Sequence, residues 1–117
     1  MTECGTLEPL IYYGRPITPE RVVEAYKAQG AGLTVGAFVT FRGEQKLCCA
    51  VGVMNEVEGR FGFQVDKEAP PTRLTAFYQG FDGLAGAPSL CAEKFPEDYA
   101  LGARCREAAE AYFAANP

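Results

Sequence analysis

The spacing of apolar positions in "TPERVVEAYKAQG" is that of an amphipathic helix. The flanking residues support it: Thr18 suits the N-cap, and Pro19 suits the first helical position, where its missing N–H is harmless. Gly30 follows the last apolar position and offers a left-handed stop. The pattern predicts a helix over Pro19–Gln29, whose apolar face carries Val22, Val23 and Tyr26.

Alternation of apolar and other residues predicts strands elsewhere. Thr34–Phe41 alternates cleanly and is followed by a plausible turn, "RGEQ". Arg60–Asp66 alternates through two phenylalanines and a valine and predicts a further strand. Pro9–Gly14 is β-branched and aromatic, and its flanking prolines indicate a short edge strand.

The segment 46–58, "KLCCAVGVMNEVE", fits two patterns. As a strand it alternates through Val53 and closes a hairpin with the preceding strand. As a helix it places its apolar residues on one stripe, and Gly59 ends it. The β-branched valines favour a strand through Val53, but the choice between strand and helix stays open.

Two helices are predicted at the C-terminal end, one from about Thr72 and one from Pro96 to about Ala114, connected by Gly86–Phe95. On a helical projection, the aromatics of "AFYQGFDGLAG" separate from its small residues, which would pack closely against alanines of the last helix. The exposed side would offer Tyr78 and Asp82 to a partner. The two small-residue faces would be Ala76, Gly80, Gly83 and Ala87 on one helix, and Ala100, Ala103 and Ala111 on the other.

Together these elements predict one α+β domain over residues 1–117. It would have a small antiparallel sheet of about three strands, one N-terminal helix and a C-terminal helical hairpin.

The chain has 117 residues, a net charge of −4 and no histidine. Lack of histidine excludes Ser-His-Asp and Cys-His catalysis and every zinc site that uses His. The acidic balance disfavours DNA and RNA as partners, because binding to their phosphates relies on Lys and Arg. Since neither a signal peptide nor a long apolar run is visible, we expect a cytoplasmic protein with no membrane contact.

Five cysteines are present, but none forms a C-x-x-C pair, so no metal or other cofactor is predicted. The adjacent Cys48 and Cys49 are the candidates for a reactive thiol, in a redox or metal-binding role. With no histidine base, their activation would need a helix N-terminus or a nearby cation such as Arg42 or Lys46.

The stretches "AFYQGFDGLAG" and "YALGARCREAAEAY" resemble the helical hairpin of ribosome modulation factor. That family is small and basic and binds ribosomal RNA, whereas this chain has four basic and six acidic residues from Thr72 onward. The resemblance therefore implies the hairpin rather than the RNA-binding function. The matching positions are Gly80, Phe81, Gly83, Gly86, Cys91, Leu101, Gly102, Arg106, Glu107 and Ala108.

In its wider layout, with a "TPE" helix start and a "GFDG" helix, the chain is similar to small uncharacterised bacterial and phage proteins. This similarity implies a bacterial, plasmid or phage origin and no known activity.

The main hypothesis is a non-enzymatic cytoplasmic module that binds a protein partner or a second copy of itself, with Tyr78 and Asp82 as candidate contacts. One alternative is a thiol-dependent protein centred on Cys48 and Cys49. The other is a ribosome-associated factor that acts through the C-terminal hairpin.

Overall fold

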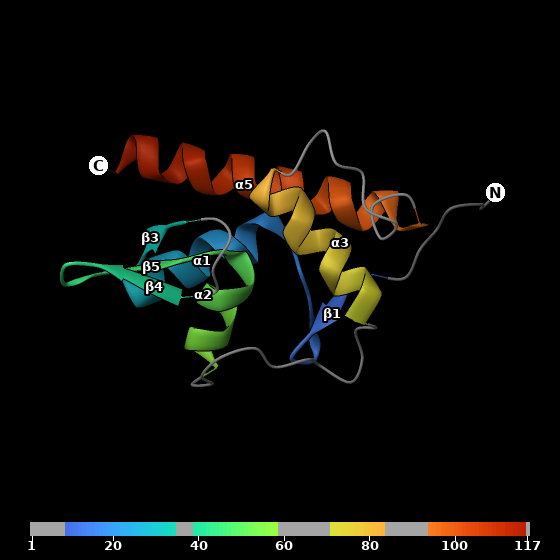
Figure 1. Cartoon of the computed structure of the whole chain (residues 1–117), viewed down its shortest axis with the longest axis horizontal. Coiled ribbons are helices and arrows are strands. Elements are labelled where there is room, and N and C mark those ends of the chain that lie inside the picture. Colours follow the sequence, from blue (N-terminus) through green and yellow to red (C-terminus); the bar gives the residue numbers. More distant parts are fainter. Residues whose placement is uncertain (1–8, 35–38, 59–70, 84–93, 117) are drawn as a thin grey trace.

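A computed structural model describes residues 9–34, 39–58, 71–83 and 94–116, and its labels follow Figure 1. The fold is α+β, as predicted. In Figure 1, α5 runs along one side of the molecule, with α3 crossing it and α1 packed beneath it. In chain order the elements are β1 (Ile11–Tyr12), β2 (Arg15–Pro16), α1 (Pro19–Gln29), β3 (Gly32–Leu33), β4 (Val39–Arg42), β5 (Gln45–Cys48), α2 (Ala50–Val57), α3 (Pro71–Asp82) and α5 (Pro96–Ala115).

Helix α1 has the predicted bounds and the predicted caps. The Thr18 side chain accepts a hydrogen bond from the backbone N–H of Arg21 at 3.0 Å. Gly30 adopts a left-handed φ of 61°, and its N–H donates to the Tyr26 carbonyl at 2.9 Å. Both ends therefore satisfy backbone groups that the helix itself leaves unpaired. The buried face consists of Val22, Ala25 and Tyr26.

The three-stranded sheet has the order β3-β5-β4. Strands β4 and β5 form the predicted antiparallel hairpin around Gly43, which has a φ of 64°. The sheet differs from the prediction in one pair, because β3 runs parallel to β5. The predicted strand at Arg60–Asp66 and the middle of the one at Thr34–Phe41 lie outside the described residues. Within Pro9–Gly14, β1 is the predicted short strand, and it pairs with β2 in a separate hairpin.

The strand expected to continue through Val53 is wrong: β5 ends at Cys48 and α2 begins at Ala50. Cys49 is the N-cap, and its Sγ accepts a hydrogen bond from the Gly52 N–H at 3.4 Å. Ala50 to Asn55 are all buried, so the first six residues of this helix are enclosed by the fold rather than buried along one stripe. The tertiary packing that surrounds α2 outweighs the β propensity of its valines.

Two tyrosine hydroxyls are buried in the core between the helices, each with a hydrogen-bond acceptor. Tyr26 donates to the Cys48 carbonyl at 2.7 Å and ties α1 to the end of β5. Tyr12 donates to Oδ1 of Asn55 and ties β1 to α2. Because a buried hydroxyl without a partner is costly, these bonds fix the relative positions of the elements they join. The largest apolar side chains around them are Phe77, Phe81, Leu10, Met54 and Leu74.

Helices α3 and α5 touch through their backbones, as the small residues of α3 predicted. A Cβ added to Gly80 would overlap the Tyr99 carbonyl, and one added to Gly102 would overlap the Phe77 carbonyl. The crossing point thus requires glycine on both helices.

The predicted partner face on α5 is wrong. Ala100 and Ala111 are exposed, and the face toward the core is Asp98, Gly102, Cys105 and Ala109. The reason is that Gly102, rather than an alanine, sits at the closest approach. Gly83 does not belong to the predicted small-residue face of α3 either. It ends that helix in a left-handed conformation with a φ of 72°.

Polar contacts hold both ends of the α3–α5 pair. Arg73 binds the buried carboxylate of Asp98 through two nitrogens, with Nε to Oδ2 at 2.7 Å and Nη2 to Oδ1 at 3.0 Å. At the other end, Nη1 of Arg106 donates to the Phe81 carbonyl at 2.9 Å. A cation at the C-terminal carbonyls of a helix complements its dipole.

We expect Gly102→Ala to destabilise the fold, although alanine favours helices. Because the added Cβ would meet backbone atoms, which cannot rotate away, the overpacking cost should lie in the upper part of the usual range, at about 2–3 kcal/mol. The helical preference returns about 1 kcal/mol, so the net loss should be about 1–2 kcal/mol. Urea unfolding measures this loss as a lower midpoint at unchanged slope. Ala111→Gly, at an exposed position of the same helix, calibrates the helical preference alone. If Gly102→Ala were as stable as the parent protein or more so, the close approach of the helices would be contradicted.

Candidate interaction surface

The sequence candidates Tyr78 and Asp82 lie one turn apart on α3, and both are half-buried. Tyr78 packs against the hydrophobic core rather than standing clear of it. Asp82 ends the helix, close enough to Tyr26 and Cys49 to contribute to their raised pKa values. Their role in partner binding stays a prediction.

The candidate thiols Cys48 and Cys49 are both buried, at the junction of β5 and α2. Burial is the main cause that raises the pKa of each thiol from 9.0 to about 11. Lys46 and the hydrogen bond from Gly52 act in the opposite direction, but burial outweighs them. The third free cysteine of the described chain, Cys105, is also buried, with a pKa of about 12. All three thiols are therefore protonated at neutral pH and shielded from solvent, which opposes nucleophilic or redox chemistry.

No group of three or more Cys, Asp or Glu side chains is placed to hold a metal ion within the ranges that the structure describes. Cys48 and Cys49 are thus not brought together with further ligands there.

A groove of about 530 Å³ lies between α1 and α2. Its apolar floor is formed by Ala25 and Ala28 of α1 and by Met54 and Val57 of α2. Val57 is 39% exposed, which is high for a large apolar side chain. A concave apolar surface with a charged rim is typical of binding sites. The rim consists of Arg15, Thr18, Glu20, Arg21, Glu24 and Glu58, and Pro16 completes the lining.

The groove exists because α1 presents small side chains where it faces the end of α2. Ala25 is buried and Ala28 is exposed, and neither reaches far enough to fill the space above Met54. The signal in the sequence is the A-x-x-A spacing on α1. It could not be interpreted without knowing that residues 50–57 form the opposite helix.

The two arginines of the groove are engaged at its β2 end. Nη1 of Arg21 donates to the carbonyls of Arg15 and Pro16, at 2.7 and 3.3 Å. Nη2 of Arg15 lies 3.8 Å from Oε2 of Glu58. This ion pair is largely exposed to solvent and adds little stability. The hydrogen bonds of Arg21 instead orient β2 against the start of α1.

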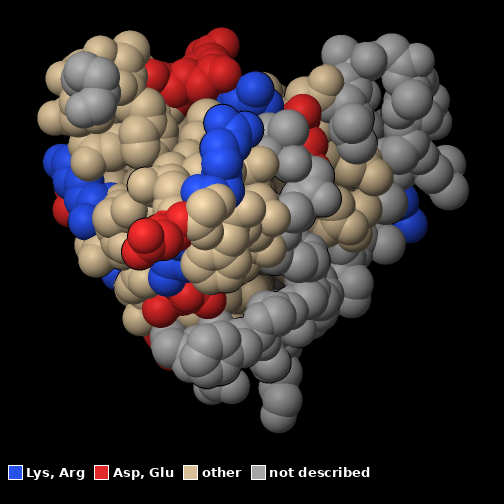
Figure 2. Space-filling model, turned by 60° about the vertical axis from the view of Figure 1, so that its left-hand side comes forward, with Lys and Arg blue, Asp and Glu red and all other residues tan. Residues whose placement is uncertain are grey.

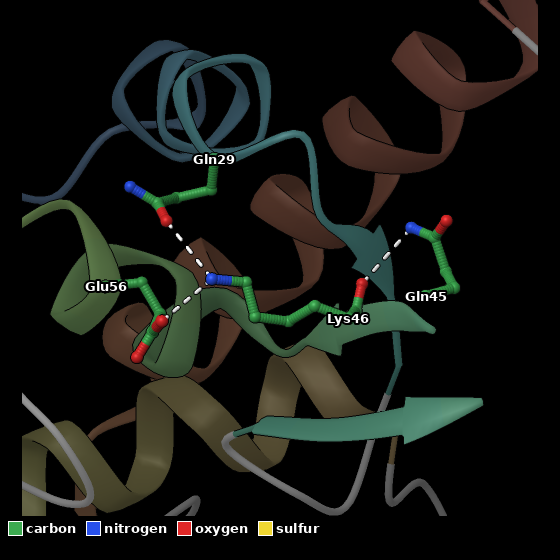
Figure 3. Close-up of polar contacts among 4 residues, drawn as sticks. All are labelled: Gln29, Gln45, Lys46 and Glu56. Carbon is green, nitrogen blue, oxygen red and sulfur yellow. Dashed lines mark hydrogen bonds and ion pairs between the residues drawn. The ribbon is translucent and has the colours of Figure 1, made fainter. Parts of the chain in front are cut away.

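Lys46 links the two helices that form the walls of the groove (Figure 3). Its Nζ lies 2.9 Å from Oε1 of Glu56 on α2 and 3.3 Å from Oε1 of Gln29 at the end of α1. Both side chains of the ion pair are largely covered, at 27% and 13% exposure. A covered pair is less screened than a surface one, so it fixes the spacing of the helices more firmly.

A second exposed apolar side chain, Phe41, lies on the edge strand β4 and is 65% exposed. It belongs to no concave surface among the described hollows. Single exposed apolar residues are common on soluble proteins. On the face in Figure 2, basic and acidic side chains are interspersed, and no extended basic patch is seen there.

Comparison of the chain with family models, with curated proteins and with solved structures returned no match. Among the described residues, none of the helices combines the length and the apolar character needed to cross a membrane. The function of the α1–α2 groove therefore has to be inferred from its geometry, because no similar protein was found.

We expect the three buried thiols to react slowly in the native protein. A thiol with a pKa of about 11 has roughly one hundredth of the thiolate, at pH 7.4, of one at the ordinary 9.0. In a Cys4→Ser/Cys91→Ser variant, reaction with Ellman's reagent should be at least about 100-fold slower than after unfolding in urea. Rapid native labelling of Cys48 or Cys49, located by mass spectrometry, would revive the thiol hypothesis.

The same pKa values predict alkaline destabilisation. In the unfolded chain the thiols lose their protons near pH 9, whereas the folded protein retains them to about pH 11. Stability from this source is complete below pH 9 and is lost as the pH rises toward 11. The free energy of unfolding, measured by urea titration at pH 7.5, 9 and 10.5, should change little between pH 7.5 and 9 and should fall between pH 9 and 10.5. Cys105→Ala should reduce the slope, and a flat profile would contradict the burial of the thiols.

Proposed function

We propose that this chain is a cytoplasmic, non-enzymatic protein-interaction module whose contact surface is the α1–α2 groove. The observation that carries the proposal is the groove itself, which combines an apolar floor around Met54 and Val57 with charged side chains at its rim. Interfaces concentrate their binding energy in such a desolvated centre surrounded by polar groups.

The groove is favoured over the other exposed features. Phe41 is a single side chain on a strand edge, and Tyr78 is already in contact with the core. The groove instead brings four apolar side chains together in a hollow large enough for an anchoring side chain.

No structural observation favours the thiol hypothesis or the ribosome hypothesis. The thiol hypothesis needs an accessible thiolate, but Cys48 and Cys49 are buried and have raised pKa values. For the ribosome hypothesis, the glycines of the hairpin are accounted for by the contact between α3 and α5. Glycines used in this way point to packing rather than to RNA.

Filling the groove tests the proposal. Ala28→Trp places a large side chain on its floor at an exposed position, so the core is left unchanged. Ala111→Trp adds the same side chain at an exposed position of α5, away from the groove, and is the matched control. In quantitative affinity capture from the native host, partners should be retained by the parent and by the control. They should be depleted by about tenfold or more with Ala28→Trp, which corresponds to about 1.4 kcal/mol.

Sedimentation of the same three proteins detects self-association through the groove, the homo-oligomeric form of the proposal. Equal thermal stability of the variants establishes that folding is unaffected. The proposal fails if the captured proteins and the oligomeric state are the same for all three proteins, or if the parent neither captures a partner nor associates.

A further inference from the structure

The N-terminal half of α1 separates two hollows. The first is the α1–α2 groove. The second, of about 220 Å³, lies between α1 and α5 and is lined by Pro19, Glu20, Val23, Glu24 and Ala108. Glu20 and Glu24 line both hollows. We call these two residues the acidic ridge.

The acidic ridge carries two like charges one helical turn apart, an arrangement that destabilises a helix by a few tenths of a kcal/mol. Glu20 gains from the positive end of the helix dipole, which falls off after the first turn and does not extend to Glu24. Nζ of Lys27 lies 3.4 Å from Oε2 of Glu24. Both side chains are exposed, that of Lys27 to 50% and that of Glu24 to 72%. Such a pair is weak and easily exchanged for another cation.

The two arginines nearest the ridge make their described contacts with other groups than its carboxylates. Arg21 donates to the carbonyls of β2, and Arg15 pairs with Glu58. The ridge therefore presents negative charge between two apolar hollows, on a chain whose net charge is already −4.

We propose that the acidic ridge and its two hollows bind a protein segment in which a Lys or Arg lies between two apolar residues. The cation contacts Glu20 and Glu24, while one apolar side chain enters the α1–α2 groove and the other covers Val23 and Ala108. This inference rests on the proposed function and specifies the chemistry of the partner.

The width of α1 sets the spacing of that segment. A helix with its side chains is about 10–12 Å across, and an extended chain advances about 3.3–3.6 Å per residue. The two apolar residues should therefore be three or four positions apart, with the basic residue between them.

Peptide display tests the inference. A random 12-residue library is selected on the parent protein alone, and the enriched peptides are then tested against the Glu20→Gln/Glu24→Gln double variant. Enriched peptides should carry the apolar–basic–apolar pattern at this spacing. Synthetic copies should bind the double variant about three- to tenfold more weakly by fluorescence anisotropy, and more weakly as salt is raised from 50 to 300 mM.

A second double variant, Glu97→Gln/Glu107→Gln, removes the same net charge from exposed positions on α5 and should leave binding nearly unchanged. Equal weakening by both double variants would indicate nonspecific attraction to an acidic protein, and the inference would be wrong.

Ala28→Trp separates this inference from the proposed function. Peptides that lack a basic residue, bind both double variants equally and fail to bind Ala28→Trp would overturn the inference and leave the groove as the contact surface. Peptides that bind Ala28→Trp as well as the parent would contradict the groove. A library that yields no groove-dependent peptide would also overturn the inference.

Discussion

The arrangement of the described helices depends on the backbone contact between α3 and α5. At Gly80 and Gly102 no side chain separates the two helices, so their distance is set by main-chain atoms. Arg73 and Asp98 anchor the pair at one end, and Arg106 anchors it at the other. Helix α1 packs on α5, and α2 packs on α1. The positions of α1 and α2 therefore build on the contact between α3 and α5.

The groove uses small residues in the opposite way. Glycine in α3 and α5 lets the helices approach until no space remains, whereas Ala25 and Ala28 in α1 face a short helix and leave the space open. The walls cannot simply close, because Lys46 fixes α2 relative to the end of α1 and Tyr26 fixes α1 relative to β5. A hollow held open in this way is preformed, which reduces the ordering cost of binding.

Local signals predicted local structure well. Helix α1 and both of its caps follow from contiguous residues, and so does the turn at Gly43. The helix at residues 50–57 did not follow, because its pattern fits a strand equally well until the burial of its first six residues is known. The α5 face was misjudged since alanine and glycine are equally acceptable small residues until the closest point of approach is known. The groove was missed entirely, because its residues span positions 15 to 58 and meet only after folding.

Stability and binding place different demands on the surface charges. The bidentate pair of Arg73 and Asp98 and the partly covered pair of Lys46 and Glu56 have clear structural roles, since each joins two elements. Glu24 has no such role, because its only ion pair among the described residues joins it to Lys27 on the same helix. The Glu24 carboxylate repels Glu20 and joins no other element, so it contributes little to stability. A role in binding a partner explains it better. Its position between two apolar hollows makes a cationic segment the occupant that its charge best complements.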